Sequence, residues 1–150
     1  MNANITISIL SHLIATSADG QKGFAEAAND ATLPLLKKAL QQRSAECSNA
    51  AAELQSLVQS IGGSRQSTGP YTTLVRRRWF RAHSFFAKSN VAVFEEVERS
   101  EDHVKAIYEK ALRCALPLPI REVVLRQHAG TIRNHYLIRK IRNSYRSSAT

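Results

Sequence analysis

The sequence contains few of the residues that interrupt helices or staple small domains. Only four of its 150 residues are proline and six are glycine, and most of these lie between long periodic segments. Its two cysteines, Cys47 and Cys114, form neither a CxxC pair nor a disulfide framework. Such cysteine usage is typical of a reducing compartment, so we expect two free thiols in a cytoplasmic protein.

Basic residues are also missing from the N-terminal segment, which has no Lys or Arg before Lys22. Thr6, Ser8 and Ser11 interrupt its apolar run, so it makes a poor signal peptide and cannot span a membrane. A chain of this length can bury a real core without disulfides or a structural metal. We therefore expect one all-α domain over residues 1–150.

Apolar residues recur at alternating steps of three and four in four long segments, which predicts four helices. We place these helices at about 5–28, 33–60, 91–115 and 119–145. Short connections join the first two and the last two, so each pair should form an antiparallel hairpin. The crossover at 62–90 is long enough to run the length of a bundle, and its LVRRRWFRAHSFFAK stretch predicts a short extra helix. This connectivity is that of a ferritin-like four-helix bundle.

Three stretches resemble a known family: LSHLIATSADGQKGFAEAA, AAELQSLVQSIGG and VERSEDHVKAIYEKAL. They are similar to an uncharacterised bacterial family, a domain of unknown function in the ferritin-like superfamily that is described as a four-helix-bundle protein. The resemblance covers about residues 5–145 and implies a ferritin-like fold. It also implies a role in bacterial stress physiology, but the family has no assigned activity to transfer.

The sequence lacks the metal-binding motif of ferritin-like proteins. A di-iron site takes one Glu from each of two helices and a Glu-x-x-His from each of the other two. No Glu-x-x-His occurs in this chain, and the nearest match is Glu46-x-x-Asn49. A non-standard iron or manganese site would have to use acidic side chains and one imidazole near the predicted seams. The candidates are Glu26, Glu46, Glu98, Glu101 and His128.

All four predicted helices carry polar residues at the same level of their apolar seams. Arg43 lies on the second seam, between Leu40 and Cys47, and Gln127 and Thr131 lie on the fourth. Because an isolated buried charge is very costly, a buried Arg43 needs a carboxylate partner. The best candidate is Glu101, and Glu98 is second. We therefore predict a polar cluster of Arg43, Glu101, Gln127 and Thr131 where metal-binding relatives hold two irons. The alternative is an arginine that extends its charged group to water at the bundle edge.

Two segments carry most of the net charge of +9. The first includes Arg76, Arg77, Arg78 and Arg81, interleaved with aromatic residues, and the second includes Arg139, Lys140 and Arg142. The simplest interpretation is a pair of solvated basic faces, with Tyr136, Leu137, Ile138 and Ile141 packed into the core. The alternatives are weak, salt-dependent binding of nucleic acid or of an anionic membrane surface.

No P-loop, GxSxG motif or catalytic triad accompanies these features. We therefore expect a non-catalytic bundle that acts through its surface, without a cofactor. An oxidase-type metal protein and a basic adaptor for nucleic acid or membrane remain the alternatives. Dimerisation is compatible with such a bundle, although no exposed seam requires it.

Overall fold

The computed structural model describes residues 2–64 and 89–149. These residues form four helices: α1 (Ala3–Asp30), α2 (Pro34–Ser60), α4 (Asn90–Leu112) and α5 (Leu118–Ala149). The prediction of an all-α chain with four long helices is therefore confirmed. The largest differences from the expected boundaries are at C-terminal ends, since α4 stops at Leu112 and α5 continues to Ala149. The extra helix expected within the crossover lies outside the described residues.

Local sequence explains where the helices begin and end. The Asn2 side chain accepts a hydrogen bond from the Asn4 amide at 2.7 Å, and the Ser89 hydroxyl does the same for the Ala92 amide at 3.1 Å. Such caps satisfy amides that have no partner within the first turn. Just after the C-terminal end of α2, Gly62 adopts a φ of 93°, a left-handed conformation that glycine tolerates best.

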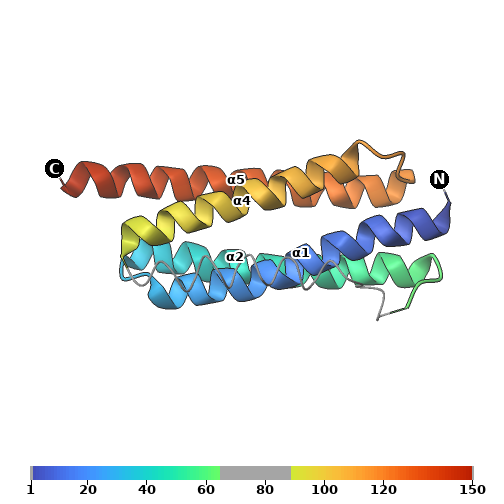
Figure 1. The fold of residues 1–150 in the computed structure, drawn as a ribbon, viewed down its shortest axis with the longest axis horizontal. Coiled ribbons are helices and arrows are strands. Elements are labelled where there is room, and N and C mark those ends of the chain that lie inside the picture. The colour runs from blue at the N-terminus through green and yellow to red at the C-terminus, as the bar shows by residue number, and fades with distance from the viewer. Residues whose placement is uncertain (1, 65–88, 150) are drawn as a thin grey trace.

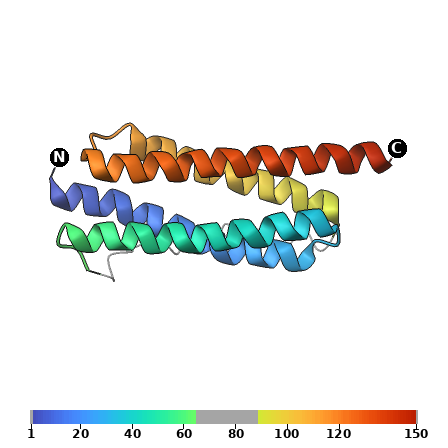
Figure 2. The same cartoon turned by 180° about the vertical axis from the view of Figure 1, so that it is seen from behind.

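The helices pack as two antiparallel hairpins, α1 with α2 and α4 with α5 (Figure 1). The hairpins meet along two lines, α1 against α4 and α2 against α5, and Figure 2 shows α2 and α5 side by side from behind. Among the described residues, α2 and α4 therefore lie across one diagonal of the bundle, and α1 and α5 lie across the other. Because α2 ends and α4 begins at opposite ends of the bundle, the crossover joins those ends.

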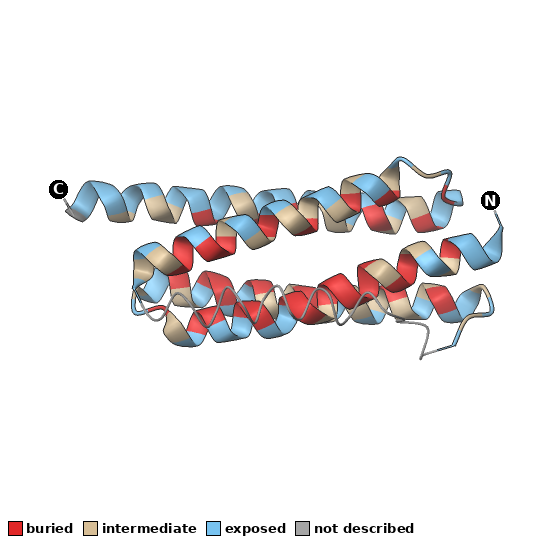
Figure 3. Ribbon diagram, in the orientation of Figure 1, coloured by how far each residue is buried: buried red, intermediate tan, exposed pale blue. Residues whose placement is uncertain are grey.

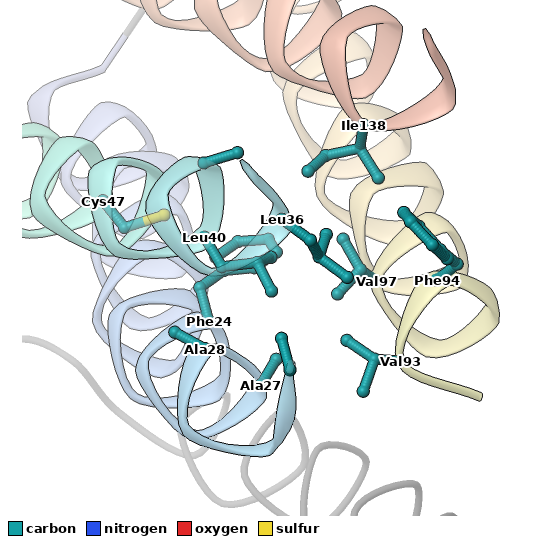
Figure 4. Close-up of a cluster of buried hydrophobic side chains, with 12 residues drawn as sticks. Phe24, Ala27, Ala28, Leu36, Leu40, Cys47, Val93, Phe94, Val97 and Ile138 are labelled. Atoms are coloured by element: carbon teal, nitrogen blue, oxygen red, sulfur yellow. The ribbon is translucent and has the colours of Figure 1, made fainter. Parts of the chain in front are cut away.

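The apolar core consists of two clusters, one towards each end of the bundle. The first cluster is shown in Figure 4, where Phe24, Leu36 and Leu40 face Phe94, Val97 and Ile138 from the other hairpin. The second cluster contains Leu10, Leu13, Leu54, Val58, Val104, Tyr108, Ile120 and Val124. The level between these two clusters is polar.

The C-terminal part of α5 extends beyond the other helices and is largely exposed (Figure 3). In that part Ile138 is buried, and Ile141 and Tyr145 are partly buried against the first apolar cluster. None of the helices in the described residues is long and apolar enough to cross a membrane.

Candidate functional site

Buried polar side chains from all four helices meet at the level between the two apolar clusters. They are Ser17 on α1, Arg43 on α2, Glu101 on α4 and Thr131 on α5. Arg43 is 6% exposed and Glu101 is fully buried. The guanidinium therefore does not extend to water at the bundle edge.

Arg43 and Glu101 form a bidentate ion pair across the bundle. The Arg43 Nε donates to Glu101 Oε1 at 2.6 Å, and Nη2 donates to Oε2 at 3.3 Å. The same Nη2 donates to the Thr131 hydroxyl at 3.2 Å, while the guanidinium carbon lies 5.3 Å from the centre of the Phe24 ring. One guanidinium thus contacts side chains from each of the other three helices. Such fork-shaped pairing is the strong form of an arginine–carboxylate contact.

The surroundings keep the guanidinium charged. Burial alone would lower the pKa of Arg43, but the negative charges around it outweigh that effect and raise the pKa above its ordinary value. Burial raises the pKa of Glu101, against the opposing effect of the Arg43 charge. The Nη1 group of Arg43 makes no hydrogen bond within the described part of the chain, and it lies 3.9 Å from Glu46 Oε2.

A second chain of hydrogen bonds leads from the core to the surface. The Tyr108 hydroxyl donates to Gln127 Oε1 at 2.7 Å, and Gln127 Nε2 donates to Glu53 Oε1 at 2.8 Å. The Tyr108 hydroxyl proton is already used in the bond to Gln127, so the Ser17 hydroxyl is the donor in its 3.3 Å hydrogen bond to the Tyr108 oxygen. Arg126 completes the chain at the surface by donating to Glu53.

Thr131 connects the two networks. Its hydroxyl accepts from Arg43 and donates to the backbone carbonyl of Gln127 at 3.3 Å. Gln127 itself bonds to Tyr108 and Glu53 rather than to Arg43 or Glu101. The structure therefore brings Arg43, Glu101 and Thr131 into direct contact and places Gln127 in the neighbouring network.

Both networks border a cavity of about 510 Å³ that is lined mainly by α2 and α5, with further residues from α1 and α4. Arg43, Tyr108 and Thr131 line its inner part, while Glu46, Glu53, Arg126 and Arg133 are among the residues nearer the surface. Its lining thus carries charges of both signs, and most of those charges already have partners within the protein.

The five candidate metal ligands do not come together. Glu101 pairs with Arg43, while Glu46 accepts a hydrogen bond of 2.5 Å from Asn134. The other three point elsewhere: Glu26 is exposed, Glu98 binds Arg142 and His128 lies 3.6 Å from Glu109. Within residues 2–64 and 89–149, no group of three His, Cys, Asp or Glu residues is placed to hold a metal ion. The five candidates are therefore distributed over separate contacts in the described residues and form no single carboxylate cluster.

Cys47 lies beside the ion pair but is chemically protected. The thiol is 3% exposed, and burial raises its pKa to about 12. A thiol rather than a thiolate is therefore present at neutral pH, and a thiol is a poor nucleophile and metal ligand. Gly20 allows α1 to approach at this point, because a Cβ there would lie 3.1 Å from the Cys47 sulfur.

The basic residues of α5 differ in their surroundings. Arg142 binds Glu98 on α4 at 2.5 Å, Arg139 contacts His135 at 3.4 Å, and Lys140 is exposed. Ile138 is buried and Ile141 is partly buried against the core, but Tyr136 and Leu137 are 70% and 40% exposed, so the interpretation that core packing absorbs all four is wrong for these two. The other basic segment, with Arg76, Arg77, Arg78 and Arg81, lies outside the described residues.

Sequence periodicity missed two members of the second network. Tyr108 follows the partly buried Ile107 by one position, and Glu53 precedes the buried Leu54 by one position. The signal that could have found Tyr108 is its position seven residues after Glu101, since both belong to the same buried face of α4. No comparable signal distinguishes Glu53 from a solvated charge.

Fold and site together define an all-α protein with two helical hairpins around a polar centre. Comparison with known families agrees with this class, since residues 5–114 match the domain of unknown function DUF2383. The chain therefore belongs to the DUF2383 family. The match ends before α5 begins at Leu118. No curated protein matches the sequence significantly.

Proposed function

We propose that this protein is a single-domain, ferritin-like bundle that acts by binding through its surface rather than by catalysis. In this proposal the Arg43–Glu101 ion pair takes the place that a metal centre has in ferritin-like relatives. The connectivity of two antiparallel hairpins with a crossover between opposite ends supports the ferritin-like assignment.

The observation that carries the proposal is the bidentate contact of Arg43 with Glu101. Glu101 is a fully buried carboxylate in the helical part of the structure, and its negative charge needs a positive partner. Arg43 supplies that charge from the facing helix. A divalent cation at this level would have to displace the guanidinium and leave it buried without a counter-charge, which is strongly unfavourable.

The cavity beside the ion pair does not suggest a catalytic mechanism. Its carboxylates, Glu46 and Glu53, are hydrogen-bonded to Asn134 and Gln127, and burial raises the pKa of both the Cys47 thiol and the Tyr108 hydroxyl to about 12. Groups held in their protonated forms at neutral pH are poor bases and nucleophiles. We therefore assign the polar centre a structural role, in which it holds the helices of the two hairpins in register.

Metal analysis tests the proposal. The protein is purified without chelator and measured by mass spectrometry for iron and manganese, before and after loading with each divalent ion and desalting. We expect far less than one equivalent in every sample. Two irons per chain, lost in a Glu101→Gln variant but kept in a Glu26→Gln variant, would overturn the proposal.

A further inference from the structure

The outer face of α5 exposes more large apolar side chains than the rest of the described surface. Eight such residues are exposed within residues 2–64 and 89–149, and five of them lie on α5. These five are Leu118, Leu125, Ile132, Tyr136 and Leu137. Single exposed apolar residues scattered over a surface are ordinary, but several on one helix are typical of an interaction site.

Four of the exposed residues on α5 form a regular row. Leu125, Ala129, Ile132 and Tyr136 follow one another at steps of four, three and four, so they share one helix face. We call these four residues the outer stripe. It extends over roughly 17 Å at the helical rise of 1.5 Å per residue. The buried residues Val124, Thr131 and Ile138 lie on the opposite face, so α5 carries two separate seams.

Basic side chains border the outer stripe on the side of α2. Arg126, Arg133 and Lys140 follow at steps of seven. Arg126 and Arg133 each come one position after a residue of the outer stripe, and Lys140 lies four positions beyond Tyr136, the last residue of the stripe. Arg126 is paired with Glu53 on α2. Arg133 and Lys140 are exposed and form no ion pair with any described residue.

Most of the opposite border of the stripe is neutralised by α4, since His128 lies near Glu109, His135 near Asp102, and Arg142 pairs with Glu98. Arg139 on that border contacts His135 and no described carboxylate. Among the described residues, positive charge without an acidic partner therefore gathers beside the C-terminal half of the stripe, at Arg133, Arg139 and Lys140. An apolar row with basic residues on its flank is the pattern that a partner helix with acidic flanking residues complements.

We propose that the outer stripe docks an amphipathic helix of another protein, with apolar residues at steps of three and four and acidic residues beside them. This inference rests on the proposed function and names the partner class of that surface. The partner's apolar row packs on Leu125, Ile132 and Tyr136, and its carboxylates pair with Arg133 and Lys140.

The charge pattern argues against a second copy of this chain as the occupant. Two α5 helices packed antiparallel along the stripe would bring the basic border of one copy against that of the other, and α5 has only Glu122 as an acidic residue. An anionic membrane surface is the other occupant that the binding experiment distinguishes.

A binding experiment with a designed peptide tests the inference. The peptide is a fluorescent helix of about three heptads with Leu at a and d and Glu at e and g, and its binding to the full chain is followed by anisotropy at moderate salt. We expect Ile132→Asp to weaken binding at least tenfold. The matched control is Ile5→Asp, because Ile5 is an exposed apolar residue on α1, across the bundle diagonal from α5, and its substitution should leave binding unchanged.

A charge exchange tests the flanking contacts. The double variant Arg133→Glu, Lys140→Glu should no longer bind the Glu peptide and should instead bind a peptide with Lys at e and g. The control, Lys22→Glu with Lys38→Glu, removes the same charge from exposed positions of α1 and α2 and should keep the original preference. Circular dichroism checks that every variant is folded.

Four results would overturn the inference. The first is that the Glu peptide does not bind, and the second is that the stripe and control variants bind it equally. The third is a dimer in sedimentation that the Ile132→Asp substitution dissociates. The fourth is that the protein binds anionic vesicles instead of the peptide, and that this binding depends on Ile132. Metal loading is measured separately. If the protein contains no metal and does not bind the peptide, only this inference is overturned. If it binds two irons, the proposed function is overturned.

Discussion

Arg43 of α2 and Glu101 of α4 meet across a diagonal of the bundle, with 2.6 Å between Nε and Oε1. Their helices belong to different hairpins and pack mainly against other helices. The ion pair therefore ties the hairpins together at one level. Its net contribution to stability is expected to be small, because desolvation offsets the attraction of buried charges. Its specific role is to set the register of one hairpin on the other.

The approach of α1 to α2 depends on Gly20. Alanine there gains about 1 kcal/mol of helix propensity but places a Cβ 3.1 Å from the buried Cys47 sulfur. Since overpacking typically costs about 1–3 kcal/mol, we expect Gly20→Ala to lower the free energy of unfolding. The same change in a Cys47→Ala background should raise it. Urea denaturation of the four proteins measures the coupling.

Gly130 provides the control for this prediction. A Cβ at Gly130 would meet only the Arg133 Nη2 atom, at an ordinary contact distance of 3.6 Å. Gly130→Ala should therefore stabilise the protein by about 0.5–1 kcal/mol. Equal effects of alanine at Gly20 and Gly130 would contradict the close packing of α1 on α2.

The Tyr108 hydroxyl links Ser17 to Gln127 inside the bundle. Tyr108→Phe leaves the Gln127 oxygen without its donor and removes the acceptor of Ser17. Loss of such a buried partner costs about 1–3 kcal/mol, so we expect a decrease of that size in the free energy of unfolding. Tyr136→Phe removes an exposed hydroxyl and should change it by less than about 0.5 kcal/mol. A negligible effect of Tyr108→Phe would show that its hydroxyl does not link the two residues.

Stability should fall in alkaline solution because of Cys47 and Tyr108. Burial raises their pKa values to about 12 from ordinary values of 9.0 and 10.0. Both groups then lose protons more easily in the unfolded chain, so their contribution to stability is present below pH 9 and is lost as the pH rises towards 12. Each group contributes a slope of about 1.4 kcal/mol per pH unit within its window.

Denaturation curves between pH 8 and pH 11 measure this slope. Cys47→Ala should reduce it from pH 9 upwards, and Tyr108→Phe should reduce it from pH 10 upwards. An unchanged slope in both variants would mean that neither group is held in its protonated form.

The contact between Glu98 and Arg142 joins α4 to the C-terminal part of α5. Both side chains are about four-fifths buried, so we expect Glu98→Arg and Arg142→Glu each to destabilise the protein by about 1–2 kcal/mol. The double variant restores the pair with its charges exchanged and should recover most of the loss. Thermal denaturation measures all three, and a double variant less stable than either single one would contradict a specific contact.

The helices and the level of the polar centre could be predicted from the sequence because both depend on periodicity. Arg43 interrupts an otherwise apolar seam, and Thr131 interrupts another at the same level. The exact residues of α4 were harder to identify. The buried face of α4 is wider than one heptad seam. Val97, Val104 and Ala111 lie on one row at steps of seven, and Phe94, Glu101 and Tyr108 lie on a second row beside it, so a search along a single seam finds only one of the two rows.

The surface of α5 could not be assigned from periodicity alone. Leu137 and Tyr136 adjoin the buried Ile138, and a short apolar run does not reveal which of its members face the core. Their exposure depends on the number of neighbouring helices, which is a property of the assembled bundle. The outer stripe is therefore recognisable only after α2 and α4 have been placed on either side of α5.

A double-mutant cycle tests whether Arg43 and Glu101 form the central ion pair of the bundle. Arg43→Ala and Glu101→Ala each leave one buried charge unpaired, which typically costs about 3–5 kcal/mol. We expect the double variant to lose much less than the sum of the two single losses, because it leaves no charge behind. Additive losses, or a double variant no more stable than the worse single one, would show that the two side chains do not form the central pair.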